Sequence, residues 1–131
     1  MNPIEPDLLY TILCDEVRRE DNGKWILLGL FERIGVGELP SMHPQCCIVN
    51  KWIGGGGAWI QQTRIIDLDD NIVVQSDALP FELNGLHASF TAVQMFRGLP
   101  LTREETLWVE VLLNGEPKQR YPLRIELIKR G

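Results

Sequence analysis

The sequence lacks any apolar stretch long enough to cross a membrane as a helix, which needs about 20 residues. The best candidate, LLYTILC at residues 8–14, is a run of only seven residues. Glu5 and Asp7 precede this run and no lysine or arginine does, whereas an export signal begins with basic residues. We therefore expect a chain that is neither exported by that route nor inserted in a membrane.

Cysteine is also scarce, since the chain has only Cys14, Cys46 and Cys47. An odd number does not make a disulfide framework, and adjacent residues on a strand point to opposite faces. Reduced, half-buried thiols are typical of cytoplasmic proteins. We expect a cytoplasmic protein without structural disulfides.

Basic residues are outnumbered: 13 lysines and arginines stand against 18 acidic residues, for a net charge of −5. The tightest basic pair, Arg18–Arg19, lies between the acidic pairs 15–16 and 20–21. A nucleic-acid-binding protein normally carries a concentrated basic patch that neutralises phosphates. On this charge pattern we expect no nucleic-acid partner.

No long segment shows apolar residues at helical spacing with capping residues. Instead, short runs rich in Val, Ile, Leu, Trp and Phe are separated by Gly, Pro, Asn and Asp, which is typical of a β-sandwich or barrel. A length of 131 residues suits one domain with one core. We predict that residues 1–131 form a single all-β domain, an antiparallel β-sandwich of about eight strands with an immunoglobulin-like layout. The predicted strands span residues 8–18, 24–34, 45–53, 58–67, 72–78, 87–97, 105–113 and 119–128, and segments 35–44 and 79–86 are expected to cross between the sheets.

The last predicted hairpin allows its register to be predicted. A two-residue Asn114-Gly115 loop would pair Val109 with Arg120 and mix apolar and charged groups on one face. A three-residue loop over 114–116, with a bulge at Gly115, pairs Leu113 with Pro117, Val109 with Tyr121 and Leu107 with Leu123. We predict the longer loop. Because prolines cannot donate to a ladder, the last strand is expected to be an edge, or to carry its prolines at outward-facing positions. Such an edge is where a second chain could add a strand.

Four consecutive glycines, in KWIGGGGAWI at residues 51–60, raise the question of a phosphate-binding loop. Such a loop opens a helix and ends in Lys-Ser/Thr, but here the sequence continues as an apolar strand. We predict a mobile hairpin tip between strands 45–53 and 58–67. Trp52 and Trp59 flank the tip, either as core residues or as an exposed aromatic clamp. The candidate binding residues are Trp52, Gly55, Gly56 and Trp59.

A metal or small-molecule site is the alternative, built from His43, Cys46 and the acidic turn DLDDN at residues 67–71. The turn does not fit the EF-hand pattern, which requires Gly where Ile72 stands and Glu where Ala78 stands. Zinc sites show paired ligand motifs, and a single His-x-x-Cys has no match elsewhere. No serine lies in a nucleophile-elbow context, and a base would have to come from one of only two histidines. We predict no catalytic residues, no metal and no cofactor.

Three stretches, ILCDEVRRE at residues 12–20, NGKWILLGLFERI at 22–34 and GEPKQRYPL at 115–123, together with the lone Trp52, resemble an uncharacterised bacterial family. Its members are stand-alone proteins of about this length, catalogued only as a domain of unknown function. The similarity runs from about Leu8 to Leu127. The resemblance implies a β-sandwich in the bacterial cytosol and brings no catalytic or binding residues with it.

Elimination therefore favours a non-catalytic protein-binding or assembly module of the bacterial cytoplasm. We expect a protein partner or self-association, with homo-oligomers forming through an edge strand. The rival is a small-molecule or metal-binding domain, with or without enzymatic activity, that uses His43, Cys46 and the turn 67–71.

Overall fold

A computed structural model describes residues 3–128, and within this range every regular element is a β-strand. The all-β prediction is confirmed. Over the same residues, no helix has the length and apolar character needed to cross a membrane. The strands are β1 (Asp7–Arg19), β2 (Trp25–Leu30), β3 (Arg33–Val36), β4 (Ser41–Ile66), β5 (Ile72–Gln75), β6 (Leu79–Leu101), β7 (Glu105–Leu113) and β8 (Glu116–Leu127).

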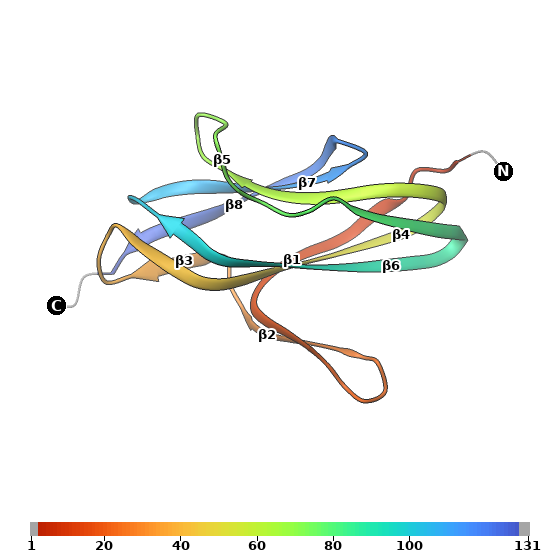
Figure 1. Cartoon of the computed structure of the whole chain (residues 1–131), viewed down its shortest axis with the longest axis horizontal. Helices are drawn as coiled ribbons and strands as arrows, with labels where there is room; N and C mark the ends of the chain where they lie inside the picture. Colours follow the sequence, from red (N-terminus) through yellow and green to blue (C-terminus); the bar gives the residue numbers. More distant parts are fainter. Residues whose placement is uncertain (1–2, 129–131) are drawn as a thin grey trace.

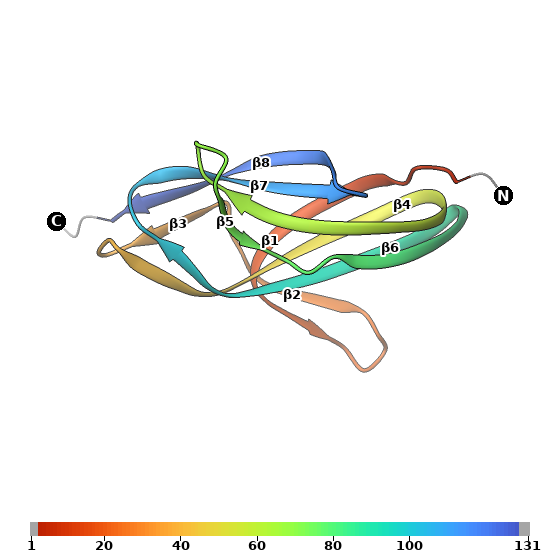
Figure 2. The same cartoon turned by 45° about the horizontal axis from the view of Figure 1, so that its top comes forward.

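The two longest strands, β4 and β6, form one antiparallel ribbon that curls back on itself (Figures 1 and 2). Their pairing runs from Ser41 opposite Leu101 to Gln61 opposite Leu79, with one register shift beside the glycines. The first arm of β4 also pairs with β1, whereas its second arm pairs with β7. The curl therefore brings the two halves of one sheet face to face.

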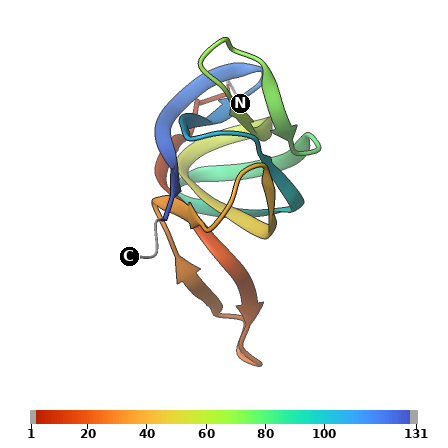
Figure 3. The same cartoon turned by 90° about the vertical axis from the view of Figure 1, so that its left-hand side faces the viewer.

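Hydrogen bonding runs through a single sheet in the order β2-β1-β4-β7-β8-β3, with β5 and β6 beside β4. Strand β3 pairs with β8 in parallel, so the sheet is mixed and the prediction of a purely antiparallel sandwich is wrong. An immunoglobulin-like layout is not confirmed. The two layers belong to one sheet because the unbroken β4–β6 ribbon continues the hydrogen-bond ladder from one layer to the other. Viewed from the end, the sheet resembles a half-barrel (Figure 3).

Several predicted boundaries change for the same reason. The predicted strands 45–53 and 58–67 are two arms of β4, and the predicted crossing segment 79–86 is the first part of β6. The predicted strand 24–34 instead divides into β2 and β3. Gly85 lies opposite Gly55, so both strands of the ribbon have glycine where they bend together.

The β7–β8 hairpin combines features of the two registers weighed from the sequence. Asn114 and Gly115 form a two-residue turn with positive φ angles of 48° and 80°, so the longer loop is wrong. Val109 nevertheless pairs with Tyr121 and Leu107 with Leu123, as predicted. A register shift at Val111/Leu112, rather than a bulge at Gly115, returns the apolar residues to one face.

The main core lies between the two facing layers. Its largest cluster joins β1, β3, both arms of β4, β6, β7 and β8, and includes Ile48, Leu99, Val109 and Leu123. A second cluster fills the interior near the bend, around Trp52 and Phe81. A smaller third cluster of Cys14, Cys47 and Val49 lies beneath the base of the β1–β2 hairpin, which projects from the body of the molecule (Figures 1 and 3).

Four buried polar side chains cross the interior between the layers. Asn50 Nδ2 on the first arm of β4 donates to Gln61 Oε1 and Thr63 Oγ1 on the second arm, at 3.0 and 2.9 Å. Gln61 Nε2 and Thr63 Oγ1 each donate to Gln94 Oε1 on β6 at 2.8 Å. Because a shifted register would leave these groups unpaired, the network favours one alignment of the curled ribbon.

Candidate functional site

An open groove of about 1100 Å³ lies between β1 and β8. We call it the β1–β8 groove. It is lined by residues 11–13 of β1, residues 30–33 between β2 and β3, and residues 121, 122, 124 and 126 of β8.

Both walls of this groove are strand edges without a paired strand over part of their length, although the Phe31 N–H donates to the Leu13 carbonyl oxygen at 3.1 Å. Strand β1 pairs with β4 on one side, and β2 covers its other side only from Cys14 onward. Strand β8 pairs with β7, and β3 covers its other edge only from Arg124 onward. Within residues 3–128, the outer edges of 8–13 and 116–123 therefore carry no ladder.

Side chains, rather than backbone hydrogen bonds, connect the two walls. The hydroxyl groups of Thr11 and Tyr121 lie 3.0 Å apart and share a hydrogen bond. Near the other end of the gap, Lys118 Nζ lies 2.7 Å from Glu5 Oε1. Since a tyrosine side chain is needed to span it, the gap is wider than the spacing of about 4.8 Å between paired strands.

The groove has both apolar and polar walls, and it is charged at one end. Ile12, Leu13 and Phe31 contribute apolar surface, and Leu30 is 61% exposed beside them. Four charged residues stand at the end where β3 joins β8: Glu32, Arg33, Arg124 and Glu126. Arg33 and Glu126 approach each other at 3.9 Å.

Burial raises the pKa of Tyr121 to about 12, although the hydrogen bond with Thr11 acts in the opposite direction. The hydroxyl is therefore protonated at neutral pH and serves as a hydrogen-bonding group. It does not have the low pKa of a base that works near pH 7. A groove with apolar surface and two free strand edges is suited to holding an extended chain.

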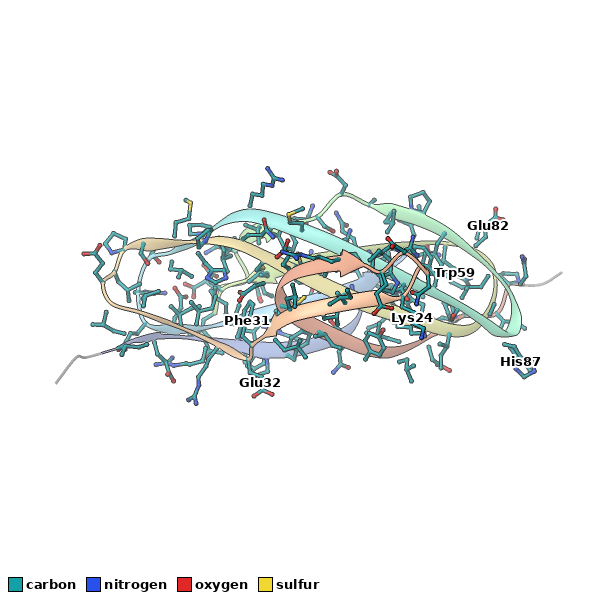
Figure 4. All side chains as sticks on the ribbon, turned by 90° about the horizontal axis from the view of Figure 1, so that it is seen from below. Lys24, Phe31, Glu32, Trp59, Glu82 and His87 are labelled. Atoms are coloured by element: carbon teal, nitrogen blue, oxygen red, sulfur yellow. The ribbon has the colours of Figure 1, made fainter. Side chains whose placement is uncertain are left out.

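The tryptophans flanking the glycine run do not form an exposed pair. Trp52 is fully buried and stacks with Phe81, with ring centroids 6.1 Å apart. Trp59 is half-buried, and its Nε1 donates to the Gly56 carbonyl oxygen at 3.1 Å. Trp59 lies at the bend end of the molecule, where Figure 4 also shows Glu82 and His87. Of the candidate binding residues, only Trp59 presents ring surface to solvent.

The glycine run is an ordered bend and not a hairpin tip, so that prediction is wrong. Residues 54–57 lie within β4, and residues 55–57 pair with β6. Gly56 also bridges to Ile4 with hydrogen bonds of 2.9 and 3.0 Å. Gly54 and Gly57 have positive φ angles of 70° and 101°, which glycine adopts without strain. A Cβ at Gly55 would lie 2.8 Å from Pro6 Cβ, so the N-terminal segment packs against bare backbone.

The structure does not bring the alternative metal ligands together. His43 and Cys46 both lie on β4 but have different neighbours. Cys46 lies in the main core, whereas His43 Nε2 lies 3.6 Å from Asp15 Oδ1. The described residues contain no group of three His, Cys, Asp or Glu side chains able to hold a metal ion.

The acidic turn 67–71 uses its own carboxylate internally. Asp67 Oδ1 accepts the backbone N–H groups of Asp69 and Asn71, each at 2.9 Å. The hydrogen bonds from Asn71 lower the pKa of Asp67. This pattern is that of a closed Asx turn that joins β4 to β5.

The thiols are poorly suited to nucleophilic chemistry. Burial raises the pKa of Cys14 to about 11 and that of Cys46 to about 12, and it also raises the pKa of Cys47. The thiolate is the reactive form of cysteine, and very little is present at neutral pH at such pKa values.

Sequence reasoning missed the groove residues Thr11 and Tyr121 and the polar network around Gln94. The sequence did contain a signal for the network. Asn50 and Gln61 lie an even number of positions from the core residues Ile48 and Ile65, so they are on the same face of the strand, and Gln94 is likewise buried. No comparable signal marks Thr11, because its partner lies 110 residues away in the chain.

These features define a small all-β protein whose curled sheet leaves a groove between two open strand edges. The chain belongs to a family of unknown function, DUF6941, whose model matches residues 9–126. The resemblance identified from the sequence is thereby confirmed as membership of an uncharacterised family. No curated protein matches the sequence.

One solved structure that resembles part of the chain is Pseudomonas fluorescens alkylpurine DNA glycosylase AlkC bound to DNA containing an abasic site analog. The match has a TM-score of 0.43 and 16% sequence identity, and it covers 72% of this chain and 28% of that one. Because that neighbour is bound to DNA, the finding contradicts our exclusion of nucleic acid, and we withdraw the exclusion. Net charge sums over the whole surface and does not forbid a local contact. At this TM-score the likeness supports neither a shared fold nor a shared activity.

Proposed function

We propose that this protein is a non-catalytic protein-binding module that holds an extended segment of a partner protein in the β1–β8 groove. The observation that carries the proposal is the pair of open edges, 8–13 and 116–123, whose residues 11–13 and 121–122 line one groove. Because the Thr11–Tyr121 hydrogen bond spans the gap, a bound strand would lie along one edge and satisfy the backbone N–H and C=O groups of that wall.

The groove also suits an extended segment chemically. Apolar side chains on its walls, such as Ile12 and Phe31, would bury alternate apolar residues of a bound strand. Charges of both signs at the β3 end, including Glu32 and Arg124, would orient the polar end of that segment. The raised pKa values of the thiols and of Tyr121 support binding rather than chemistry at these groups.

We further propose that the protein works in the cytoplasm. The thiols of Cys14, Cys46 and Cys47 are free in the described chain. Cys14 and Cys47 are opposite each other on β1 and β4, a placement in which an oxidising compartment favours a bridge.

The groove proposal is tested with a random peptide library displayed on phage and selected against the purified chain. A blocked variant, Ile12→Lys, places a charge on the groove wall, and Ile72→Lys makes the same change at an exposed site on β5. We expect selected peptides to bind wild type and Ile72→Lys alike and Ile12→Lys at least about tenfold more weakly, a difference of about 1.4 kcal/mol.

Hydrogen exchange locates the bound peptide independently. We expect a selected peptide to slow exchange most at amides of residues 8–13 or of residues 116–123. Equal binding to Ile12→Lys and wild type, or protection centred on another part of the chain, would show that the groove is not the binding site.

A further inference from the structure

The outer edge of β2 is also open. Strand β2 stands at the end of the sheet order and pairs only with β1 in the part of the chain that the structure describes. The hairpin that it forms with β1 projects from the body of the molecule (Figures 1 and 3). A two-stranded ribbon is marginally stable by itself in water, so this hairpin would gain from a third strand.

The β2 edge, from Trp25 to Leu30, carries neither a charged side chain nor a proline, two protections that edge strands commonly have. Leu27 packs against the cluster of Cys14, Cys47 and Val49, so one face of the strand is anchored on the molecule. Leu28 and Leu30, at alternate positions, are 38% and 61% exposed, so the other face presents apolar surface to solvent.

We propose that β2 pairs antiparallel with β2 of a second copy of this chain and forms a two-fold symmetric dimer. A second copy is the fitting partner because the two ends of the strand carry opposite charges, Lys24 before it and Glu32 after it. Figure 4 shows both side chains reaching the surface. In an antiparallel pair of identical strands, each end meets the opposite end of the other copy.

Charge and apolar pattern select one register. Pairing centred on Leu28 places Leu28 opposite its symmetry mate, Ile26 opposite Leu30, and Lys24 opposite Glu32, with the last two pairs occurring twice. A slip by one residue in either direction would set Lys24 opposite Phe31 or opposite Arg33, and would separate the leucines.

This dimer goes beyond the proposed peptide groove, because it uses a different edge and a different partner. Leu30 and Glu32 line the end of the groove as well, whereas Leu28 does not. Leu28→Lys therefore separates the two proposals. It places two lysines against each other on the two-fold axis and leaves the groove unchanged.

Sedimentation equilibrium of the full chain over a range of concentrations tests the dimer. We expect Leu28→Lys to raise the dimer dissociation constant at least about tenfold, while Ile72→Lys leaves it unchanged. Far-ultraviolet circular dichroism establishes that each variant is folded. A wild-type chain that stays monomeric at high concentration, or a dimer insensitive to Leu28→Lys, overturns the proposal.

A charge exchange tests the register. Lys24→Glu and Glu32→Lys each set like charges opposite each other, so each variant alone should dimerise more weakly than wild type. Mixed together, they should form a heterodimer in which both charge pairs are complementary again. A mixture that associates no better than its components overturns the register. A selected peptide that still binds Leu28→Lys shows that the groove function stands whatever the outcome for the dimer.

Discussion

Tyr121 is the residue at which one hydroxyl contributes both to stability and to the shape of the groove. Its hydrogen bond with Thr11 joins β8 to β1, two strands without a shared ladder in the described residues. A neutral hydrogen bond of this kind contributes about 1 kcal/mol to the free energy of unfolding. We expect Tyr121→Phe to lose about that amount at pH 7, whereas Tyr10→Phe should change stability little because the Tyr10 hydroxyl has no hydrogen-bond partner among residues 3–128.

Tyr121 also makes the free energy of unfolding of the wild-type chain depend on pH in a definite direction. An exposed tyrosine ionises near pH 10, and burial raises the pKa of Tyr121 to about 12. Between these values the unfolded chain releases the proton first, so the free energy of unfolding falls as pH rises, by at most about 1.4 kcal/mol per pH unit. Below pH 10 this contribution is fully present.

Urea unfolding of wild type and Tyr121→Phe between pH 7 and pH 11 measures how the difference in free energy of unfolding between the two proteins changes with pH. The thiols of Cys14 and Cys46 add an alkaline loss common to both proteins, because their pKa values are also raised above 9. We expect the stability gap between the two proteins to narrow above pH 10. A constant gap would mean that the Tyr121 hydroxyl is not buried in solution.

The buried network is a second feature at the scale of single residues. Replacing Gln94 with Leu removes the acceptor for both Gln61 Nε2 and Thr63 Oγ1 and leaves two buried donors without it. We expect a loss of about 2–4 kcal/mol in the free energy of unfolding, measured by urea titration, since each unpaired buried group costs about 1–3 kcal/mol. Gln75→Leu, on exposed surface, is the matched control and should change stability by less than about 0.5 kcal/mol. Equal effects of the two substitutions would show that the network does not hold the layers together.

At the scale of the element, β4 depends on backbone without side chains at its bend. A Cβ at Gly55 would lie 2.9 Å from both Ile4 O and Pro6 Cα, closer than packed atoms tolerate. We expect Gly55→Ala to reduce the free energy of unfolding by about 1–3 kcal/mol through overpacking against the N-terminal segment. Thermal unfolding followed by circular dichroism measures the loss.

Gly37 provides the matched control for that substitution. It lies in the exposed connection before β4, and a Cβ there would meet no atom within 4 Å. Gly37→Ala is expected to be neutral or stabilising by up to about 1 kcal/mol, because it restricts the unfolded chain. If Gly55→Ala is as mild as Gly37→Ala, the bend is loose in solution and the mobile tip expected from the sequence is the better description.

At the scale of the whole molecule, the curl of one ribbon determines which surfaces exist. By bringing the two arms of β4 face to face, it places the open edge of β1 across a groove from the open edge of β8. It also leaves the β1–β2 hairpin projecting with its outer edge open (Figure 3). The peptide groove and the dimer edge are thus separate consequences of one topology.

The sequence alone was enough to identify the class of secondary structure, because alternating apolar residues and turn residues act over short distances. It was sufficient to predict the all-β class and the pairing of Val109 with Tyr121. The alternation of apolar residues in the two strands of a hairpin identifies the face that is buried. Even there, the sequence placed the bulge at Gly115, whereas packing favoured the register shift at Val111/Leu112.

The tertiary structure was needed to assign the glycine run as a bend and not a loop, because the continuity of β4 depends on pairing with β6 and on the bridge to Ile4. It was also needed to show that Trp52 is a core residue, that His43 and Cys46 have different neighbours, and that Thr11 contacts Tyr121. Each of these facts depends on which distant strands become neighbours. Local propensity carries no information about that choice, which is made by the burial of the two faces of the curled sheet against each other.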